Sequence, residues 1–322
     1  MLAVALLGSG LMLICLLIAV IYSAWPMGTL AAIPQPTSTP TPMPTATPSS
    51  TPTPIPLPTA THTHTPTPEM TQPQAHQLLG RPFDDEHGNE PSRHYPYGST
   101  AGGKYRVHRG ADFPNPSGAP VLAAARGRVI VAGTDRRVVF GERVGFYGNV
   151  VIVQLEQTHR GQKIYVLYGH LSNVHVQFLQ EVDEGDLIGE VGMTGVAIGP
   201  HLHLEVRVGQ NSYEHTRNPE LWLRPLPEKG TVAGLLVDAQ GQPIPGHALT
   251  FYRSETPDRR WQDAATYPLS EVNVDGEWPE NFVLGDVPAG QYLIKTYVNG
   301  HLYTEEVTVR AGEIAYVTMV AT

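Results

Sequence analysis

The alternation of apolar and polar positions divides the chain into three stretches of different character. The first, Met1 to Trp25, is a continuous apolar run without charged side chains. The second, residues 26–77, is polar and rich in proline and threonine. From about Leu78 onward, short apolar runs are separated by glycine, proline and asparagine, which is typical of a folded β-rich chain. The pattern predicts an N-terminal hydrophobic segment, a linker and a globular remainder.

Several apolar runs in the globular remainder have the length and composition of β-strands. Helical periodicity is weak there, and the single helical turn that we expect lies near Asn218–Leu223. We therefore predict an all-β fold with mostly antiparallel sheets. The strongest candidate strands in its first part are Val129–Val131, Val150–Leu155, Ile164–Tyr168 and His201–Val208.

Two prolines and a glycine punctuate Pro225–Gly230, which we interpret as a linker between two β domains, residues 78–226 and 230–322. In the second domain, Asn299-Gly300 separates two apolar runs and is the strongest short-range signal for a type I′ hairpin. The strands expected in this domain are Gly230–Val237, Tyr292–Val298, Leu302–Val309 and Ile314–Val320.

The N-terminal run, residues 1–25, has about 20 core apolar residues, enough to cross a bilayer as a helix. It lacks the basic residues of a signal peptide, so an uncleaved membrane anchor is favoured, although Tyr22-Ser23-Ala24 leaves cleavage and secretion open. Between Pro26 and Pro73 lie 14 of the 30 prolines, a composition that cannot form a packed core. We predict a disordered, extended stalk that holds an extracytoplasmic folded region at the cell membrane.

Composition limits the chemistry that the chain can carry. The net charge of -9 and the absence of any run dense in lysine or arginine argue against binding to nucleic acid. The single cysteine, Cys15, lies in the apolar N-terminal run, so neither an intrachain disulfide nor a thiolate metal cluster can form. Any metal ion must therefore be held by histidine, aspartate or glutamate.

Two histidines share one face of a predicted strand. In the run from His201 to Val208, strict alternation places His201 and His203 on one face and leucine and valine on the other. Two imidazoles on a rigid strand can converge on one point. An ordinary amphipathic strand with a polar face has the same pattern, so this run alone leaves both interpretations open.

A second group, His108 and Asp112, places an imidazole and a carboxylate four residues apart. Gly110 and Pro114 oppose a helix there, so we expect a loop that presents both side chains. A further histidine, His170, follows an apolar run and one glycine. Taken singly, each of these is also explained by an ordinary surface loop.

Together these residues define a candidate metal site. Two histidines and one carboxylate supply three ligands and leave a fourth position for water, which is the arrangement of catalytic zinc, whereas structural zinc has a fourth protein ligand. Zinc lowers the pKa of bound water, and an imidazole that is not a ligand can accept its proton or stabilise a developing oxyanion. We predict one Zn²⁺ ion in the first β domain.

The remaining histidines of the folded part lie near predicted turns or stand isolated, and we expect ordinary solvated or strand-end residues without a chemical role. They are His76, His87, His94, His159, His175, His215, His247 and His301.

The H-x-x-x-D motif at His108 and the H-x-H motif at His201, with His170 between them, closely resemble those of the lysostaphin/LytM family of peptidoglycan metalloendopeptidases. The resemblance covers Tyr95 to Leu223. It extends to Gly118–Ala124, Gly148–Val151, Tyr168–Leu171, Gly185–Gly189, Gly199–Glu205 and Asn218-Pro219.

The resemblance implies that His108, Asp112 and His203 bind zinc and that His170 and His201 assist catalysis. It implies a two-lobed antiparallel β-sheet groove, the duplicated hybrid motif. The implied activity is hydrolysis of peptide bonds in the cross-links or stems of bacterial peptidoglycan.

The second domain, residues 230–322, resembles more loosely an Ig-like or transthyretin-like β-sandwich of the carboxypeptidase-regulatory type. The resemblance rests on Gly234–Pro243 and Val287–Tyr292 and implies a spacer or adhesive module. The first domain departs from its family pattern at Leu204, where an aromatic residue is common. It also departs at Thr134–Tyr147, an insertion that either lines the substrate groove or forms a passive hairpin.

Two other functions are compatible with parts of this pattern. A non-catalytic wall-binding or amidase-activating module is one, although all the metal ligands and both auxiliary histidines are retained here. An extracellular protease acting on ordinary proteins is the other, because the ligands do not specify which peptide bond enters the groove. The sequence specifies neither that bond nor the oligomeric state.

Overall fold

The structure is a computed structural model that describes residues 76–268 and 272–322. Over these residues the chain is almost entirely β structure, with two single-turn 3-10 helices, η1 (Tyr213–His215) and η2 (Pro219–Leu221). The all-β prediction is confirmed, and η2 lies within the one helical turn expected. No described residue belongs to a helix with the length and hydrophobicity of a membrane span. The predicted anchor, residues 1–25, and nearly all of the predicted stalk lie outside the described residues.

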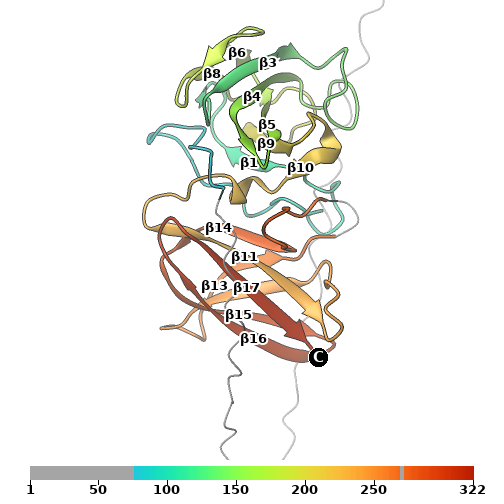
Figure 1. The fold of residues 1–322 in the computed structure, drawn as a ribbon, viewed down its shortest axis with the longest axis vertical. Coiled ribbons are helices and arrows are strands. Elements are labelled where there is room, and N and C mark those ends of the chain that lie inside the picture. Colours follow the sequence, from blue (N-terminus) through green and yellow to red (C-terminus); the bar gives the residue numbers. More distant parts are fainter. Residues whose placement is uncertain (1–75, 269–271) are drawn as a thin grey trace, which may run out of the picture. The chain divides into compact units, whose positions relative to one another are not determined.

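A seven-stranded antiparallel sheet dominates the first half of the described chain (Figure 1). Its strand order is β1-β9-β5-β4-β3-β7, and β10 pairs with β9. The four strongest predicted strands all lie within β3, β4, β5 and β9, so local periodicity located them correctly. The strands are β1 (Ala111–Pro114), β3 (Gly127–Thr134), β4 (Asn149–His159), β5 (Gln162–Leu171), β7 (Glu181–Val182), β9 (His201–Val208) and β10 (Thr216–Arg217).

A small second sheet packs with the large one through a shared hydrophobic core. Its order is β2-β8-β6, with β2 at Pro120–Leu122, β8 at Leu187–Glu190 and β6 at Asn173–Val174. Val121 and Ile188 of this sheet are fully buried in the same cluster as the apolar side chains of β9, such as Leu202 and Leu204. The apolar face of β9 therefore points into the core and leaves its histidine-bearing face for other contacts.

The C-terminal half contains two further sheets, β14-β11-β17 and β13-β12-β15-β16, whose side chains meet in one hydrophobic cluster. The predicted hairpin is confirmed: β15 pairs with β16, and Asn299 and Gly300 have φ values of 51° and 82°, as a type I′ turn requires. β11 and β17, however, pair in parallel. The strands are β11 (Lys229–Asp238), β12 (Ala248–Arg253), β13 (Arg260–Ala265), β14 (Phe282–Pro288), β15 (Gly290–Val298), β16 (His301–Val309) and β17 (Ile314–Ala321).

The two halves share buried side chains. The cluster that holds the core of the large sheet also contains Trp278 and Ile314 from the C-terminal half. Glu220 of η2 accepts hydrogen bonds from Arg93 Nη1 at 2.6 Å and from the backbone N–H of Gly285 at 2.7 Å. The described residues accordingly belong to one compact unit, and the division into domains 78–226 and 230–322 stays a prediction.

Candidate metal centre

The register of the large sheet brings the predicted ligands together. His203 of β9 pairs with Asp112 of β1 on one side and with Gly169 of β5 on the other. His108 stands shortly before β1, and His170 follows Gly169. Residues as far apart in the sequence as His108 and His203 thus converge at one level of the sheet.

Asp112 lies on a strand, which corrects the expectation of a loop that presents both His108 and Asp112. Pro114, which opposes a helix, is the last residue of the short edge strand β1, where a missing N–H is tolerated. Gly110 permits the close approach to β9, because a Cβ there would lie 2.6 Å from Cε1 of His203. His108 remains outside the strand.

Three side-chain atoms face one another across β1 and β9. His203 Nδ1 lies 2.8 Å from Asp112 Oδ1 and 3.1 Å from His108 Nε2, and His108 Nε2 lies 3.1 Å from Asp112 Oδ1. We call these three residues the β1–β9 cluster. The histidines are 5% and 7% exposed, so the cluster is largely shielded from solvent.

His170 and His201 flank the β1–β9 cluster. The His201 Nε2 atom lies 3.6 Å from Asp112 Oδ1, and the His170 and His201 ring centroids are 4.9 Å apart. One loop fixes both rings, since Nδ1 of His170 is 2.8 Å from the Thr194 carbonyl and Nδ1 of His201 is 2.9 Å from the Gly199 carbonyl. With Nδ1 donating in each ring, Nε2 is the nitrogen that is free to accept a proton.

The backbone of His170 is itself unusual, with φ at 63° in the left-handed region. A non-glycine residue adopts this conformation only where its surroundings impose it, and such residues concentrate at functional sites. The backbone N–H of His170 donates to the Tyr147 carbonyl at 2.9 Å, which holds the turn. The ring of His170 is thereby placed 5.6 Å, centroid to centroid, from that of His203.

Burial and charge set the protonation of these groups in the metal-free chain. Burial, together with the neighbouring His203 and His201, lowers the pKa of His170 to about 3, so His170 is neutral at neutral pH. Burial also lowers the pKa of His201. Burial alone would lower the pKa of His203, but its partners Asp112 and Glu205 outweigh burial and raise it to about 9. Burial raises the pKa of Asp112, yet His108 and His203 hold it well below its usual range.

A second layer of buried polar residues supports His203 from behind. Its Nε2 lies 3.1 Å from Glu205 Oε1, and Glu205 also pairs with Arg207 at 2.7 Å and accepts a hydrogen bond from the Tyr147 hydroxyl. Glu205 and Arg207 are fully buried. Glu205 accepts a hydrogen bond from the Nε2–H group of His203. When His203 is neutral, its Nδ1 atom therefore carries the lone pair and presents it to the β1–β9 cluster.

Glu205 and Arg207 were not predicted as site residues, although the sequence pattern contained the information. The alternation that placed His201 and His203 on one face of β9 also placed Glu205 and Arg207 there. Tyr147 belongs to the predicted insertion Thr134–Tyr147, and the Phe140 carbonyl of that segment accepts a hydrogen bond from Arg207 at 2.8 Å. The segment therefore packs on the polar face of β9. Its role in lining a substrate groove stays a prediction.

His108 is oriented by an aromatic residue that was also missed. The ring of Tyr95 stacks on His108 with centroids 4.3 Å apart and planes 13° from parallel. The Tyr95 hydroxyl donates to the Arg106 carbonyl, which ties the stacked ring to the chain that leads into His108. Local spacing gave no indication of this contact.

The β1–β9 cluster fits a zinc ion. Ligand atoms about 2.0–2.1 Å from a tetrahedral zinc lie on the order of 3.3 Å from one another. The observed separations of 2.8 to 3.1 Å are close to this value. Two imidazole nitrogens and one carboxylate oxygen converge at these distances, which is a donor set that a cation can share. The group His108, Asp112 and His203 therefore has the donor types and the convergence that a metal ion requires.

Two of the histidines expected to be solvated are not. His76 is 5% exposed and His159 is 13% exposed, so the prediction for these residues is wrong. Their partners come from the C-terminal half of the chain, and no local pattern reveals such partners. His94, His175 and His301 are exposed as expected.

Comparisons with known proteins match the segment that holds this site. The family model described as Peptidase family M23 matches residues 106–215, about a third of the chain. The matched segment contains the β1–β9 cluster together with His170 and His201. The similarity to peptidase family M23 is thus located in the segment that carries the site.

Two curated relatives share that segment. A protein of Neisseria meningitidis named DD-carboxypeptidase/endopeptidase Mpg is 38% identical over 104 residues, which are 32% of this chain and 21% of the relative. A Vibrio cholerae protein named peptidoglycan DD-endopeptidase ShyB is 32% identical over 121 residues, which are 38% of this chain and 24% of the relative. The chain thus spans about a fifth to a quarter of the length of these relatives.

Among solved structures, the catalytic domain of lysostaphin from Staphylococcus simulans is similar to this chain. The sequence identity is 27%, and the alignment covers 46% of this chain and 96% of that domain. The TM-score is 0.33, too low to establish a shared fold.

Proposed function

We propose that this chain is a zinc-dependent endopeptidase that hydrolyses peptide bonds in the cross-links or stems of bacterial peptidoglycan. The observation that carries the proposal is the β1–β9 cluster, with His170 and His201 beside it. Three ligands that converge, flanked by two proton-accepting imidazoles, are what metal-assisted hydrolysis requires.

Each residue has a definite role in this proposal. His108 Nε2, Asp112 Oδ1 and His203 Nδ1 hold the metal. Bound zinc supplies Lewis-acid chemistry, because it polarises a carbonyl group and lowers the pKa of water. His201 and His170 each carry their proton on Nδ1, donated to a backbone carbonyl, and so can accept a proton at Nε2.

The same two histidines serve the later part of the reaction. Once protonated at Nε2, His170 or His201 can donate a hydrogen bond to a developing oxyanion or pass the proton to the leaving amine.

The names of the relatives support the choice of substrate. One is named a DD-carboxypeptidase/endopeptidase and another a peptidoglycan DD-endopeptidase, and both share the segment that holds the site. We extend their printed substrate class to this chain as part of the proposal.

The test uses the full-length protein, loaded with zinc, on purified peptidoglycan. We expect soluble fragments whose masses, measured by mass spectrometry, correspond to cleavage of a stem or cross-link peptide bond, and no such fragments after treatment with a chelator. Peptidoglycan that is bound but not cut would favour a non-catalytic wall-binding or amidase-activating module. Cleavage of an unfolded protein, but not of peptidoglycan, would favour an extracellular protease.

The proposal includes an architecture and a location. We propose that the first half of the described chain is the duplicated hybrid motif and that the C-terminal sheets are an Ig-like or transthyretin-like sandwich serving as a spacer. Residues 1–25 would anchor the protein in the cell membrane, with the stalk 26–77 holding the peptidase on the extracytoplasmic side. The protein should then sediment with membranes, and a variant that starts after Trp25 should not.

A further inference from the structure

A second group of histidine and carboxylate side chains lies outside the peptidase site. His76 precedes all the described strands, His159 ends β4, and Glu277 lies between β13 and β14. Their side chains are 5%, 13% and 14% exposed. We call these three residues the His76 cluster. One ligand atom of each lies within 4.8 Å of the others.

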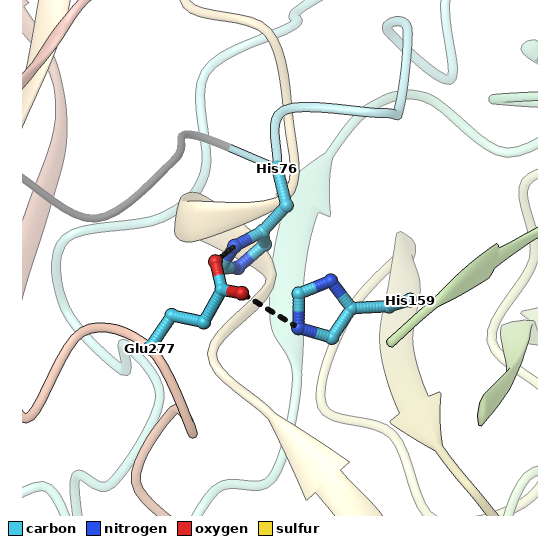
Figure 2. Close-up of side chains that lie close together, drawn as sticks. All are labelled: His76, His159 and Glu277. Atoms are coloured by element: carbon cyan, nitrogen blue, oxygen red, sulfur yellow. Dashed lines mark ion pairs between the residues drawn. The ribbon is translucent and has the colours of Figure 1, made fainter. Parts of the chain in front are cut away.

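Both rings of the His76 cluster face one carboxylate. Figure 2 shows the imidazoles of His76 and His159 directed at Glu277 from two sides. His76 Nδ1 lies 3.7 Å from Glu277 Oε2, and His159 Nε2 lies 3.9 Å from Glu277 Oε1. These distances are too long for hydrogen bonds but leave room for an ion between the three groups.

The nitrogens of His76 are unusual for a buried ring. Among the residues that the structure describes, neither Nδ1 nor Nε2 of His76 has a hydrogen-bond partner. Nε2 nevertheless has a charged neighbour, because Asp275 Oδ2 lies 3.1 Å from it. Nδ1 has none so close, since the Glu277 carboxylate that it faces is 3.7 Å away. Buried polar atoms are nearly always hydrogen-bonded or bound to an ion or water, so Nδ1 is the nitrogen that lacks a partner.

The surroundings exclude water and carry excess negative charge. Trp222 covers the cluster, with its ring 4.2 Å from that of His76 and 5.2 Å from that of His159. The two carboxylates, Asp275 and Glu277, are balanced by one fixed cation, Arg160, whose Nε lies 2.8 Å from Glu277 Oε1. Another positive charge would complete the balance.

We propose that His76 Nδ1, His159 Nε2 and the Glu277 carboxylate bind a second divalent metal ion of the zinc class. Imidazole and carboxylate are ligands that zinc takes at about 2.0–2.2 Å. Tetrahedral contacts of that length need ligand atoms on the order of 3.3 Å apart, so the two gaps to Glu277, 3.7 and 3.9 Å, close by a few tenths of an ångström on binding. The ion joins the first described residue to the end of β4 and to the C-terminal half of the chain.

A bound proton is the competing explanation. Protonated His76 and His159 would also neutralise Asp275 and Glu277, and this arrangement would need no metal. The two explanations differ in a quantity that can be measured directly, the number of metal ions per chain.

The experiment counts zinc in the full-length protein, purified in detergent, equilibrated with zinc chloride and freed of loosely held ions. Elemental analysis should give about two zinc ions per chain in the wild type and about one in His159→Asn and in Glu277→Gln. His175→Asn is the matched control, because His175 also pairs with a glutamate, Glu190, but is exposed on the surface. It should keep both ions.

Circular dichroism identifies any variant that fails to fold. If His159→Asn unfolds, Glu277→Gln replaces it, because glutamine keeps the shape of the glutamate side chain. About one ion in the wild type, lost completely in His203→Ala, would overturn the inference. So would a folded His159→Asn or Glu277→Gln with the wild-type zinc content.

The inference and the proposed function can fail separately. If His159→Asn loses one ion and the wild type leaves peptidoglycan intact, the second site stands and the peptidase proposal falls. If peptidoglycan is cleaved and the zinc content of His159→Asn is unchanged, the peptidase proposal stands and the second metal site is ruled out.

Discussion

The β1–β9 cluster and the His76 cluster have the same kind of ligands, two histidines and one carboxylate, but they are built differently. In the first, Asp112 and His203 lie on paired strands of one sheet and His108 stands shortly before β1, with ligand atoms 2.8 to 3.1 Å apart. The second joins three separate segments, with gaps to Glu277 of 3.7 and 3.9 Å. Strand register therefore preorganises the first site, whereas the second needs a small closure around the ion.

The surroundings differ as well. The β1–β9 cluster has two further imidazoles beside it, and Glu205 fixes the tautomer of His203. The His76 cluster has a tryptophan over it and an arginine already bound to its carboxylate. The β1–β9 cluster, which has additional proton acceptors beside it, is suited to catalysis. The His76 cluster, which is covered by an indole ring, is suited to a structural metal ion that joins segments of the chain. The following predictions test this distinction, beginning with the largest effect.

Replacing His203 by alanine should abolish cleavage of peptidoglycan, because it removes a ligand at the centre of the β1–β9 cluster. Zinc content should fall by about one ion per chain, since the His76 cluster keeps its own. Elemental analysis and fragment release measure the two effects on the same sample. Loss of both ions from a folded variant would show that the clusters are not independent.

His170→Ala should separate chemistry from metal binding. His170 is not among the three ligands, so the zinc content should stay at the wild-type value. The rate of cleavage should fall by about 10²–10⁴-fold, the usual contribution of a general acid or base. Measured kcat with His175→Ala as the control tests this, and a wild-type kcat in His170→Ala would refute its role.

Glu205→Gln should weaken zinc binding at the β1–β9 cluster without removing a ligand. The loss of a group that orients a metal-bound histidine typically costs 10–100-fold in affinity. Arg207, which is fully buried, would also lose its charge partner, so the free energy of unfolding should fall by about 3 kcal/mol or more.

The control for this change is Glu181→Gln, which breaks the exposed ion pair with Arg128 and should cost no more than about 1 kcal/mol. Zinc titration and urea denaturation supply both numbers. Equal stability of the two variants would mean that the buried pair contributes nothing beyond a surface pair.

Arg160→Ala should have the smallest effect, and it should increase the affinity for zinc rather than decrease it. Arg160 competes with a metal for Glu277, and its side chain is 64% exposed, so its removal should tighten zinc binding at the His76 cluster by up to about fivefold. Affinity at the β1–β9 cluster should not change. Weaker zinc binding in this variant would favour the view that protons, not a metal, hold the His76 cluster together.

Local patterns predicted much of the fold. The runs at Val150–Leu155 and His201–Val208 became β4 and β9 because alternation or continuous apolar character is enough to specify a strand. The Asn299-Gly300 turn was predictable because few residues accept its positive φ values. The parallel pairing of β11 with β17 was not predictable, since pairing direction depends on how distant segments pass each other.

The residues of the candidate site also divide into those indicated by local sequence patterns and those that depend on contacts between distant segments. His108, Asp112, His170, His201 and His203 stand in short motifs, so their residue types alone indicated a site. Tyr95 and Tyr147 act through contacts that only the folded chain creates. His76 was misjudged for the same reason: its partner Glu277 lies about 200 positions away and carries no motif.

The side chains that the two halves share have a thermodynamic consequence. Trp278 and Ile314 lie in the same hydrophobic cluster as Leu202 and Leu204, so melting either half exposes apolar surface of the other. The described region should then unfold in a single cooperative step, with equal calorimetric and van't Hoff enthalpies. A protease that removed the C-terminal sheets would therefore leave the half that carries the β1–β9 cluster less stable, so the lifetime of that site depends on a distant part of the chain.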